Sequence, residues 1–193
     1  MTTTLTSFGH GTADREELLR LFEDVQVRRV VDVRRFPNSR HNLDVRHDAL
    51  ATWLPQAGID YLWEERLGGR RTLPRTEGAE PDPWWRVKSF RAYAAHTRTP
   101  DFRTALDELI GGLDAFTEGT ILFMCSESLW WRCHRRLISA TAQLLADVDV
   151  QHLDHQGKLT AHQPSPGARV ADNELFYDVM DDADAAGPAD RDS

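Results

Sequence analysis

Short apolar runs alternate with amphipathic segments along the first 155 residues, and this alternation constrains the fold more than any other feature. "VRRVVDV" at 27–33 and "GTILFMC" at 119–125 have the apolar, often β-branched character of strands that are buried on both faces. "DREELLRLFEDV" at 14–25 instead places its apolar side chains on one face of a helix. The alternation predicts an α/β fold, a three-layer Rossmann-like sandwich with a mostly parallel central sheet.

The other segments follow the same pattern. Further strands are expected at 3–8, 59–63 and 148–153, and further helices at 43–58, 84–99, 100–116 and 131–147. The chain is long enough for one domain with a substantial core, and rather short for two. We therefore expect an α/β domain at 1–155, a C-terminal extension packed on it at 156–180, and an acidic disordered tail at 181–193.

Charge and composition limit the function. The formal net charge of −8 argues against a protein that coats nucleic acid through its overall charge. Segments of about 18 apolar residues that could cross a membrane are missing, as is a signal-like N-terminus, so we expect a cytoplasmic protein without membrane contact. The two cysteines are expected to be free thiols in that reducing compartment.

Four unusual segments follow the predicted strands: "GHG", "DVRRFPNSR", "LGGRR" and "CSESLWWRCHRR". Open parallel sheets bind ligands beyond the carboxyl ends of their strands, so these segments predict one pocket. Its expected members are Gly9, His10, Gly11, Asp32, Arg34, Ser39, Arg40, Gly68, Gly69, Arg70, Cys125, Glu127, Cys133, His134 and Arg135. The arginines make it cationic, which suits a small anionic or phosphorylated ligand or a nucleotide.

Most of these residues also have a purely structural interpretation. The glycines could serve tight turns, and Asp32 with Arg34 could form a buried polar network. Ser39 and Arg40 could belong to an ordinary turn. Tyr93 is a further candidate for the pocket, although an aromatic side chain on a helix more often packs in the core.

Cys125 ends a predicted strand, where a following helix could lower its pKa and make it a nucleophile, with His10 or His134 as acid or base. Its position is similar to that of the active cysteine in rhodanese-like and low-molecular-weight phosphatase domains, and "VVDVR" also resembles the rhodanese pattern. Sulfur transfer is the chemistry nearest that pattern. Six residues separate Cys125 from Arg132; they include bulky Leu129, Trp130 and Trp131 and no glycine, and this departs from the five-residue spacing of a phosphatase loop. A buried structural cysteine is the alternative.

The sequence indicates no metal site. On one helix, Cys133 and His134 would point about 100° apart, and no CxxC or HxxxH spacing supports metal binding. The cofactor and the oligomeric state remain open, as does whether the protein is an enzyme. Trp84, Trp85 and Trp130 lie beside arginines and could stack on bases, so a non-catalytic nucleic-acid-binding module is the alternative function. A protein-interaction module is a third.

The order of motifs resembles one known family. "FGHGT", "VVDVRRFPNSR", "YLWEERLGGRR", "FRAYAAH", "DFRTALDELI" and "ILFMCSESLWWRCHRRLIS" together resemble the domain of unknown function 488 (DUF488) family over residues 5 to 155. "LTAHQPSPGARVADNELFYD" is similar to an extension that many members carry. The resemblance implies the α/β fold but no established activity.

Overall fold

The computed structural model describes residues 4–73, 78, 80–116 and 118–180. Its strands are β1 (Thr4–Gly9), β2 (Val27–Asp32), β3 (Asp60–Trp63), β4 (Thr120–Cys125), β5 (Asp149–Leu153), β6 (Leu159–Ala161), β7 (Ala168–Ala171) and β8 (Glu174–Tyr177). Its α-helices are α1 (Arg15–Asp24), α2 (His47–Gln56), α3 (Lys88–Thr97), α4 (Pro100–Gly111) and α5 (Arg135–Ala146). The short 3-10 helices are η1 (Glu65–Leu67), η2 (Gly112–Ala115) and η3 (Trp130–Arg132).

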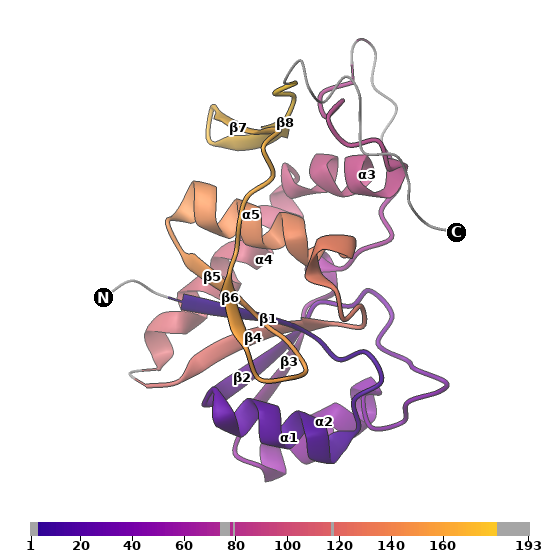
Figure 1. Cartoon of the computed structure of the whole chain (residues 1–193), viewed down its shortest axis with the longest axis vertical. Coiled ribbons are helices and arrows are strands. Elements are labelled where there is room, and N and C mark those ends of the chain that lie inside the picture. Colours follow the sequence, from indigo (N-terminus) through magenta and orange to yellow (C-terminus); the bar gives the residue numbers. More distant parts are fainter. Residues whose placement is uncertain (1–3, 74–77, 79, 117, 181–193) are drawn as a thin grey trace.

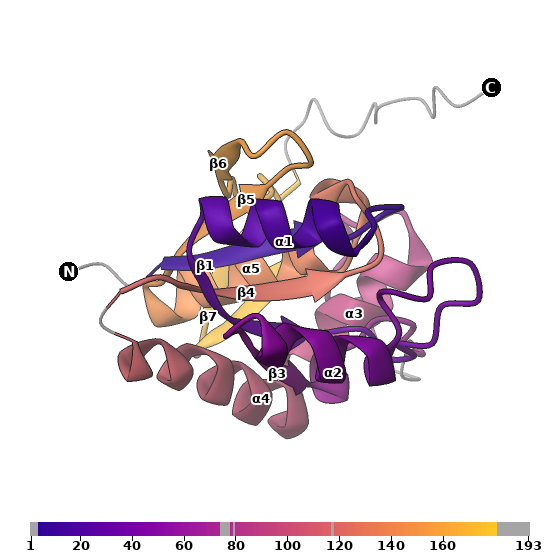
Figure 2. The ribbon, with the colours of Figure 1, turned by 90° about the horizontal axis from the view of Figure 1, so that it is seen from below.

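A central sheet separates two helical layers (Figure 1). Within the described residues the strand order is β3-β2-β4-β1-β5-β6, and only β6 pairs antiparallel to its neighbour. Helices α1 and α2 lie side by side across one face of the sheet in the view from below (Figure 2), and α3, α4 and α5 cover the other face. The predicted three-layer α/β sandwich with a mostly parallel sheet is confirmed.

Strand β4 shows how the sequence builds the two cores. Ile121 and Phe123 contribute to the core under α3, α4 and α5, whereas Leu122 and Met124 contribute to the core under α1 and α2. Alternate residues of a strand point to opposite faces, so a continuously apolar strand fills both layers. Cys125 continues this alternation and lies on the face covered by α3, α4 and α5.

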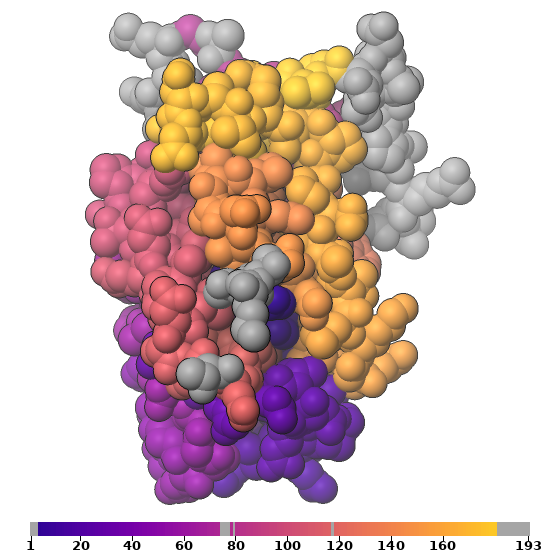
Figure 3. Space-filling view, turned by 90° about the vertical axis from the view of Figure 1, so that its left-hand side faces the viewer, coloured from indigo at the N-terminus to yellow at the C-terminus, as the bar shows by residue number. Residues whose placement is uncertain are grey.

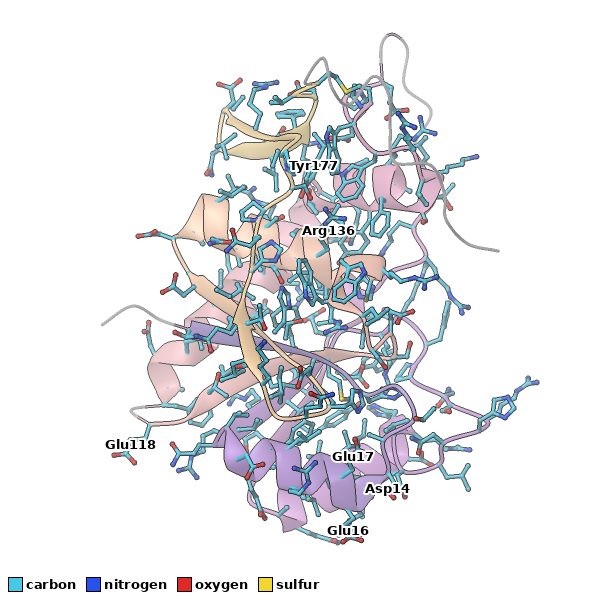
Figure 4. All side chains as sticks on the ribbon, in the orientation of Figure 1. Asp14, Glu16, Glu17, Glu118, Arg136 and Tyr177 are labelled. Carbon is cyan, nitrogen blue, oxygen red and sulfur yellow. The ribbon has the colours of Figure 1, made fainter. Side chains whose placement is uncertain are left out.

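Side-chain caps mark the starts of α1 and α4. The Asp14 side chain accepts a hydrogen bond from the Glu17 backbone N–H at 2.9 Å and caps α1, with Glu16 and Glu17 in the first turn (Figure 4). Helix α4 begins with Pro100, as predicted, after a cap by Thr99. Capping therefore defines both helix starts.

Three helices begin later than their apolar patterns predict, and α2 is the first of them, at His47 instead of 43. Helix α3 begins at Lys88 instead of 84, because the Trp84 backbone N–H donates to the Tyr177 carbonyl at 3.0 Å. Helix α5 begins at Arg135 instead of 131, because η3 is followed by Cys133 in an extended conformation, with φ −127° and ψ 156°. The later start of α5 matters for the site, because it leaves Cys133 just ahead of the helix.

The C-terminal residues cover α3 and α5. Strands β7 and β8 form a hairpin whose turn residues, Asp172 and Asn173, have φ of 51° and 59°. Buried Asp82 accepts hydrogen bonds from the Arg98 guanidinium at 2.6 and 3.0 Å and from the Tyr177 backbone N–H at 3.0 Å. Figure 3 shows the β7–β8 hairpin in yellow beside the orange α5. The acidic tail predicted at 181–193 lies outside the described residues.

Candidate functional site

A cavity of about 510 Å³ lies at the carboxyl ends of the parallel strands. The loops after β1, β2, β3 and β4 contribute to it, together with the N-terminal half of α3 and the segment before α5. Its walls consist of His10, Arg34, Arg35, Phe36, Asn38, Ser39, Gly69, Arg70, Ser89, Phe90, Tyr93, Cys125, Ser126, Glu127, Arg132, Cys133 and His134. The four segments singled out in the sequence therefore meet in space.

The two cysteines are free thiols in the cavity wall, and their sulfur atoms are 2.8 Å apart. Both side chains are almost fully buried. The sequence favours Cys125 as the residue ahead of a helix, but η3 intervenes, and Cys133 occupies that position instead. Cys133 thus lies where the unpaired N–H groups of α5 stabilise negative charge.

The surroundings of the two sulfurs shift the pKa values of Cys125 and Cys133 in opposite directions. Burial raises the pKa of Cys133, but hydrogen bonds from Cys125 and Arg135 and the positive charge of Arg135 outweigh burial and lower this pKa to about 7. Burial raises the pKa of Cys125 well above its ordinary value, as does its S–H hydrogen bond to Cys133. Cys133 is therefore the thiol that ionises first.

His134 lies on the outer side of Cys133. Its Nε2 is 3.0 Å from the Val33 carbonyl oxygen, which can only accept, so Nε2 carries the proton. Nδ1 is then a free acceptor 3.4 Å from the Cys133 sulfur. The predicted divergence of Cys133 and His134 assumes that both are helical, and it is wrong, because Cys133 is extended and His134 is the N-cap residue of α5.

Arg135 lies beneath the cysteines and not in the cavity wall. Its Nε donates to the Cys125 sulfur at 3.0 Å, and its Nη1 donates to the Ser7 hydroxyl at 2.9 Å. Its Nη2 donates to the Glu127 carbonyl oxygen. With only 1% of its surface exposed, Arg135 is an internal cation that connects β1, the loop after β4 and α5.

Arg34 and Asp32 form the buried polar network that was the structural alternative. Arg34 donates to both Asp32 carboxylate oxygens, at 2.8 and 2.5 Å, and to the Val45 carbonyl at 2.8 Å. Its Nη1 also donates to His10 Nε2 at 3.1 Å, while His10 Nδ1 donates to the Gly11 carbonyl at 3.0 Å. Burial and then the Arg34 charge lower the pKa of His10 to about 4, so His10 is neutral at pH 7.

The cavity rim carries guanidinium groups that are free to bind. Arg70 and Arg132 line the cavity and make no side-chain hydrogen bond or ion pair within the described part of the chain. Arg35 is partly engaged, because its Nη1 donates to the Arg70 carbonyl at 2.7 Å. Arg132, like Ser89 and Phe90 of α3, was not selected from the sequence, where nothing marks these residues as neighbours of the cysteines.

Several predicted members lie outside the cavity wall: Gly9, Gly11, Asp32, Arg40, Gly68 and Arg135. The glycines allow close contact between loops. A Cβ on Gly68 would be 2.8 Å from the Arg35 backbone, and Gly11 has a φ of +51°. Arg40 is exposed and away from the wall. The predicted residues His10, Arg34, Ser39, Gly69, Arg70, Cys125, Glu127, Cys133 and His134 do come together there, as does Tyr93.

The tryptophans proposed for base stacking make contacts inside the protein. The Trp130 ring stacks on His152, with ring centroids 4.0 Å apart. Trp85 stacks on Phe90 at 4.7 Å, and the Arg136 guanidinium lies 4.8 Å from the centre of the Trp85 ring. Figure 4 labels Arg136, which belongs to α5, and Tyr177, the last residue of β8.

Groups of three or more potential metal-binding side chains do not occur among the described residues. Nor does any described helix combine the length and apolar character that a bilayer crossing requires. The arrangement instead provides a thiol of low pKa, an imidazole beside it and, at the rim, two arginines without a side-chain partner among the described residues.

The fold and the site define a Rossmann-like α/β protein with a cysteine pair at the carboxyl ends of its strands. The chain belongs to the family described as domain of unknown function DUF488, whose model matches residues 14–142. The resemblance seen in the sequence motifs is thereby confirmed. No match was found among curated proteins or among solved structures.

The low pKa of Cys133 can be measured by alkylation with iodoacetamide. Because its pKa is lowered to about 7, the thiolate should be abundant at neutral pH. We expect the Cys133 rate to rise about tenfold per pH unit below pH 7 and to level off above about pH 8. Cys125 should stay unmodified in this range, as followed by peptide mass spectrometry.

The same protein in denaturant is the control, since both thiols should then titrate near the ordinary value of about 8.5. A folded-state midpoint for Cys133 near that value, or faster alkylation of Cys125, would contradict the assignment.

Proposed function

We propose that this protein is an enzyme that binds a small anion in the cavity and attacks it with the Cys133 thiolate. The observation that carries the proposal is the position of the Cys133 sulfur, in the cavity wall, 2.8 Å from Cys125 and 3.4 Å from His134 Nδ1. A thiolate stabilised at neutral pH is a strong nucleophile. The sequence favours Cys125 for this role; the order of the two pKa values favours Cys133.

The anionic character of the substrate follows from the rim. Among the described residues, the Arg70 and Arg132 guanidinium groups have no ion-pair partner, whereas Arg34 is committed to Asp32. Guanidinium groups bind sulfonate, phosphate and carboxylate oxygens through paired N–H donors. The Glu127 side chain accepts a hydrogen bond from the Leu129 backbone N–H at 3.0 Å, so part of its charge is directed to its own loop.

Sulfur transfer is the reaction we propose, with thiosulfate as the test substrate. The Cys133 thiolate attacks the outer sulfur of thiosulfate and forms a new S–S bond. The original S–S bond breaks, sulfite leaves with its electron pair, and a Cys133 persulfide remains. His134 Nδ1 can accept the thiol proton of Cys133 before the attack, because Nε2 already holds the other proton.

Intact-protein mass spectrometry tests the proposal. With thiosulfate at pH 7.5, the reduced wild-type protein should gain one sulfur atom and release one sulfite, and Cys133→Ser should gain none. Arg132→Gln should require a higher thiosulfate concentration for the same loading, because it loses an anion contact at the rim. Arg20→Gln on α1, whose side chain is 56% exposed, is the matched control with unchanged loading.

A gain of sulfur that persists in Cys133→Ser and disappears in Cys125→Ser would move the nucleophile to Cys125. A wild-type protein that gains no sulfur and releases no sulfite would overturn the proposed sulfur transfer.

A further inference from the structure

The proposed sulfur transfer needs one cysteine, yet the cavity wall contains two in direct contact. Cys125 lies on the face of β4 toward α5, and Cys133 lies just before α5, so their sulfurs meet at 2.8 Å although eight positions separate them in sequence. A disulfide bond is about 2.05 Å long, so the sulfurs need to approach by less than about 1 Å to form one. Both thiols are free and both line the cavity.

We propose that Cys133 and Cys125 form a peroxide-reducing dithiol pair, in which Cys133 is oxidised by a hydroperoxide and Cys125 resolves it to an intramolecular disulfide. The activity goes beyond sulfur transfer but rests on the same nucleophile. The cavity of about 510 Å³ leaves ample room for hydrogen peroxide or a small organic hydroperoxide to reach Cys133.

The chemistry is a two-electron oxidation in two steps. The Cys133 thiolate attacks one peroxide oxygen, the O–O bond breaks, and hydroxide leaves and takes a proton from solvent to become water. Cys133 is then a sulfenic acid. Cys125 attacks the sulfenic sulfur, the S–O bond breaks, and a second water leaves as the S–S bond forms. Two thiols are oxidised and one hydroperoxide is reduced.

The contacts around Cys125 fit the resolving step. The Arg135 guanidinium, 3.0 Å away, stabilises the negative charge that the Cys125 sulfur carries as it attacks. The Glu127 carbonyl oxygen lies 3.8 Å from the same sulfur and is the alternative acceptor for its S–H when Cys133 does not accept it. Arg135 is itself held by Ser7 at 2.9 Å, so the cation does not depend on Cys125 for its position.

The pair also connects oxidation to the proposed function. A disulfide removes the Cys133 thiolate, so the oxidised protein cannot accept a sulfur atom. Thiol reductants reverse a disulfide by exchange, whereas oxidation of Cys133 to a sulfinic acid would inactivate it permanently. Cys125 would thus protect the nucleophile as well as complete the reduction of the peroxide.

The test treats the reduced full-length protein with hydrogen peroxide and follows intact mass under non-reducing conditions. Wild type should lose two hydrogen atoms, form no disulfide between chains, and regain the hydrogens with dithiothreitol. Cys125→Ser should instead gain one oxygen atom that dimedone traps on Cys133. Cys133→Ser should react at least about tenfold more slowly than wild type, because the remaining thiol has a raised pKa.

Wild-type oxidation to a sulfinic acid without an intramolecular disulfide would overturn the proposal, as would equal peroxide rates in wild type and Cys133→Ser. The wild-type measurement does not depend on the folding of any variant, and circular dichroism of each variant checks that it is folded. The two proposals fail separately. Loss of two hydrogens without sulfur gain from thiosulfate rejects only sulfur transfer, and sulfur gain without disulfide formation rejects only the peroxide activity.

Discussion

Replacing Gly9 by alanine should lower the free energy of unfolding by about 3 kcal/mol. Gly9 is the last residue of β1, and a Cβ there would lie 1.8 Å from the Glu127 carbonyl oxygen and 2.6 Å from Arg135 Nη2. Neither neighbour can move freely, because the Glu127 carbonyl accepts a hydrogen bond from buried Arg135. The loop after β4 would have to shift, and the Cys125 environment with it.

Urea unfolding of wild type and Gly9→Ala measures this loss. The matched control is Gly111→Ala at the exposed end of α4, where φ is −59° and no atom lies near the added Cβ. That substitution should be neutral or stabilise the protein by up to about 1 kcal/mol, because alanine favours the helix. A Gly9→Ala protein as stable as wild type would show that the loop adapts and would favour a ligand role for this glycine.

Replacing Arg135 by methionine should have two effects: a loss of about 3 kcal/mol of stability and a higher pKa for Cys133. Methionine fills much of the volume but leaves Ser7, the Glu127 carbonyl and the Cys125 sulfur without their donor. Buried acceptors without partners are costly. The net loss of stability is smaller than the unpaired acceptors alone would cause, because the substitution also removes a buried charge that is costly to desolvate.

The change in pKa has a definite sign. Arg135 lowers the pKa of Cys133 through its charge and its hydrogen bonds, while burial acts in the opposite direction. Without Arg135 the burial effect remains, so the pKa rises and the thiolate fraction at pH 7 falls. We expect alkylation of Cys133 at pH 7 to slow by about tenfold, with recovery at higher pH.

Arg20→Met on α1 is the control for both measurements, because its ion pair with Asp24 is exposed. It should change stability by less than about 0.5 kcal/mol and leave the alkylation profile unchanged. If Arg135→Met alkylated as fast as wild type at pH 7, the acidity of Cys133 would have to come from α5 and Cys125 alone.

Local patterns in the sequence determined the layers and the general position of the site. Continuous apolar character at 119–125 requires a strand buried on both faces, and alternation with amphipathic helices requires parallel strands. Parallel strands bring the loops that follow them to one edge of the sheet, so the segments containing His10, Arg70 and Cys125 could be expected to meet. These conclusions need only periodicity and chain connectivity.

The identity of the acidic thiol was decided by tertiary structure. The apolar pattern of α5 extends smoothly to 131, and nothing in it indicates that Cys133 is extended ahead of the helix. Nor does it indicate that the Cys133 sulfur lies 3.4 Å from Nδ1 of the next residue, His134. The role of Arg135 depends on Ser7, which is 128 positions away. The six residues before Arg132, whose number and bulky members argue against a phosphatase-like loop, form the turn that carries Cys133 back to Cys125.

The sequence by itself therefore determined the α/β class, the family and the edge of the sheet where the loops gather, because these depend on local periodicity and on the order of motifs along the chain. Tertiary structure alone decided which arginines are buried and which are free, and which of two thiols ionises first. Charge and acidity depend on burial and on contacts between segments that are distant in the sequence, and no local pattern encodes those distances.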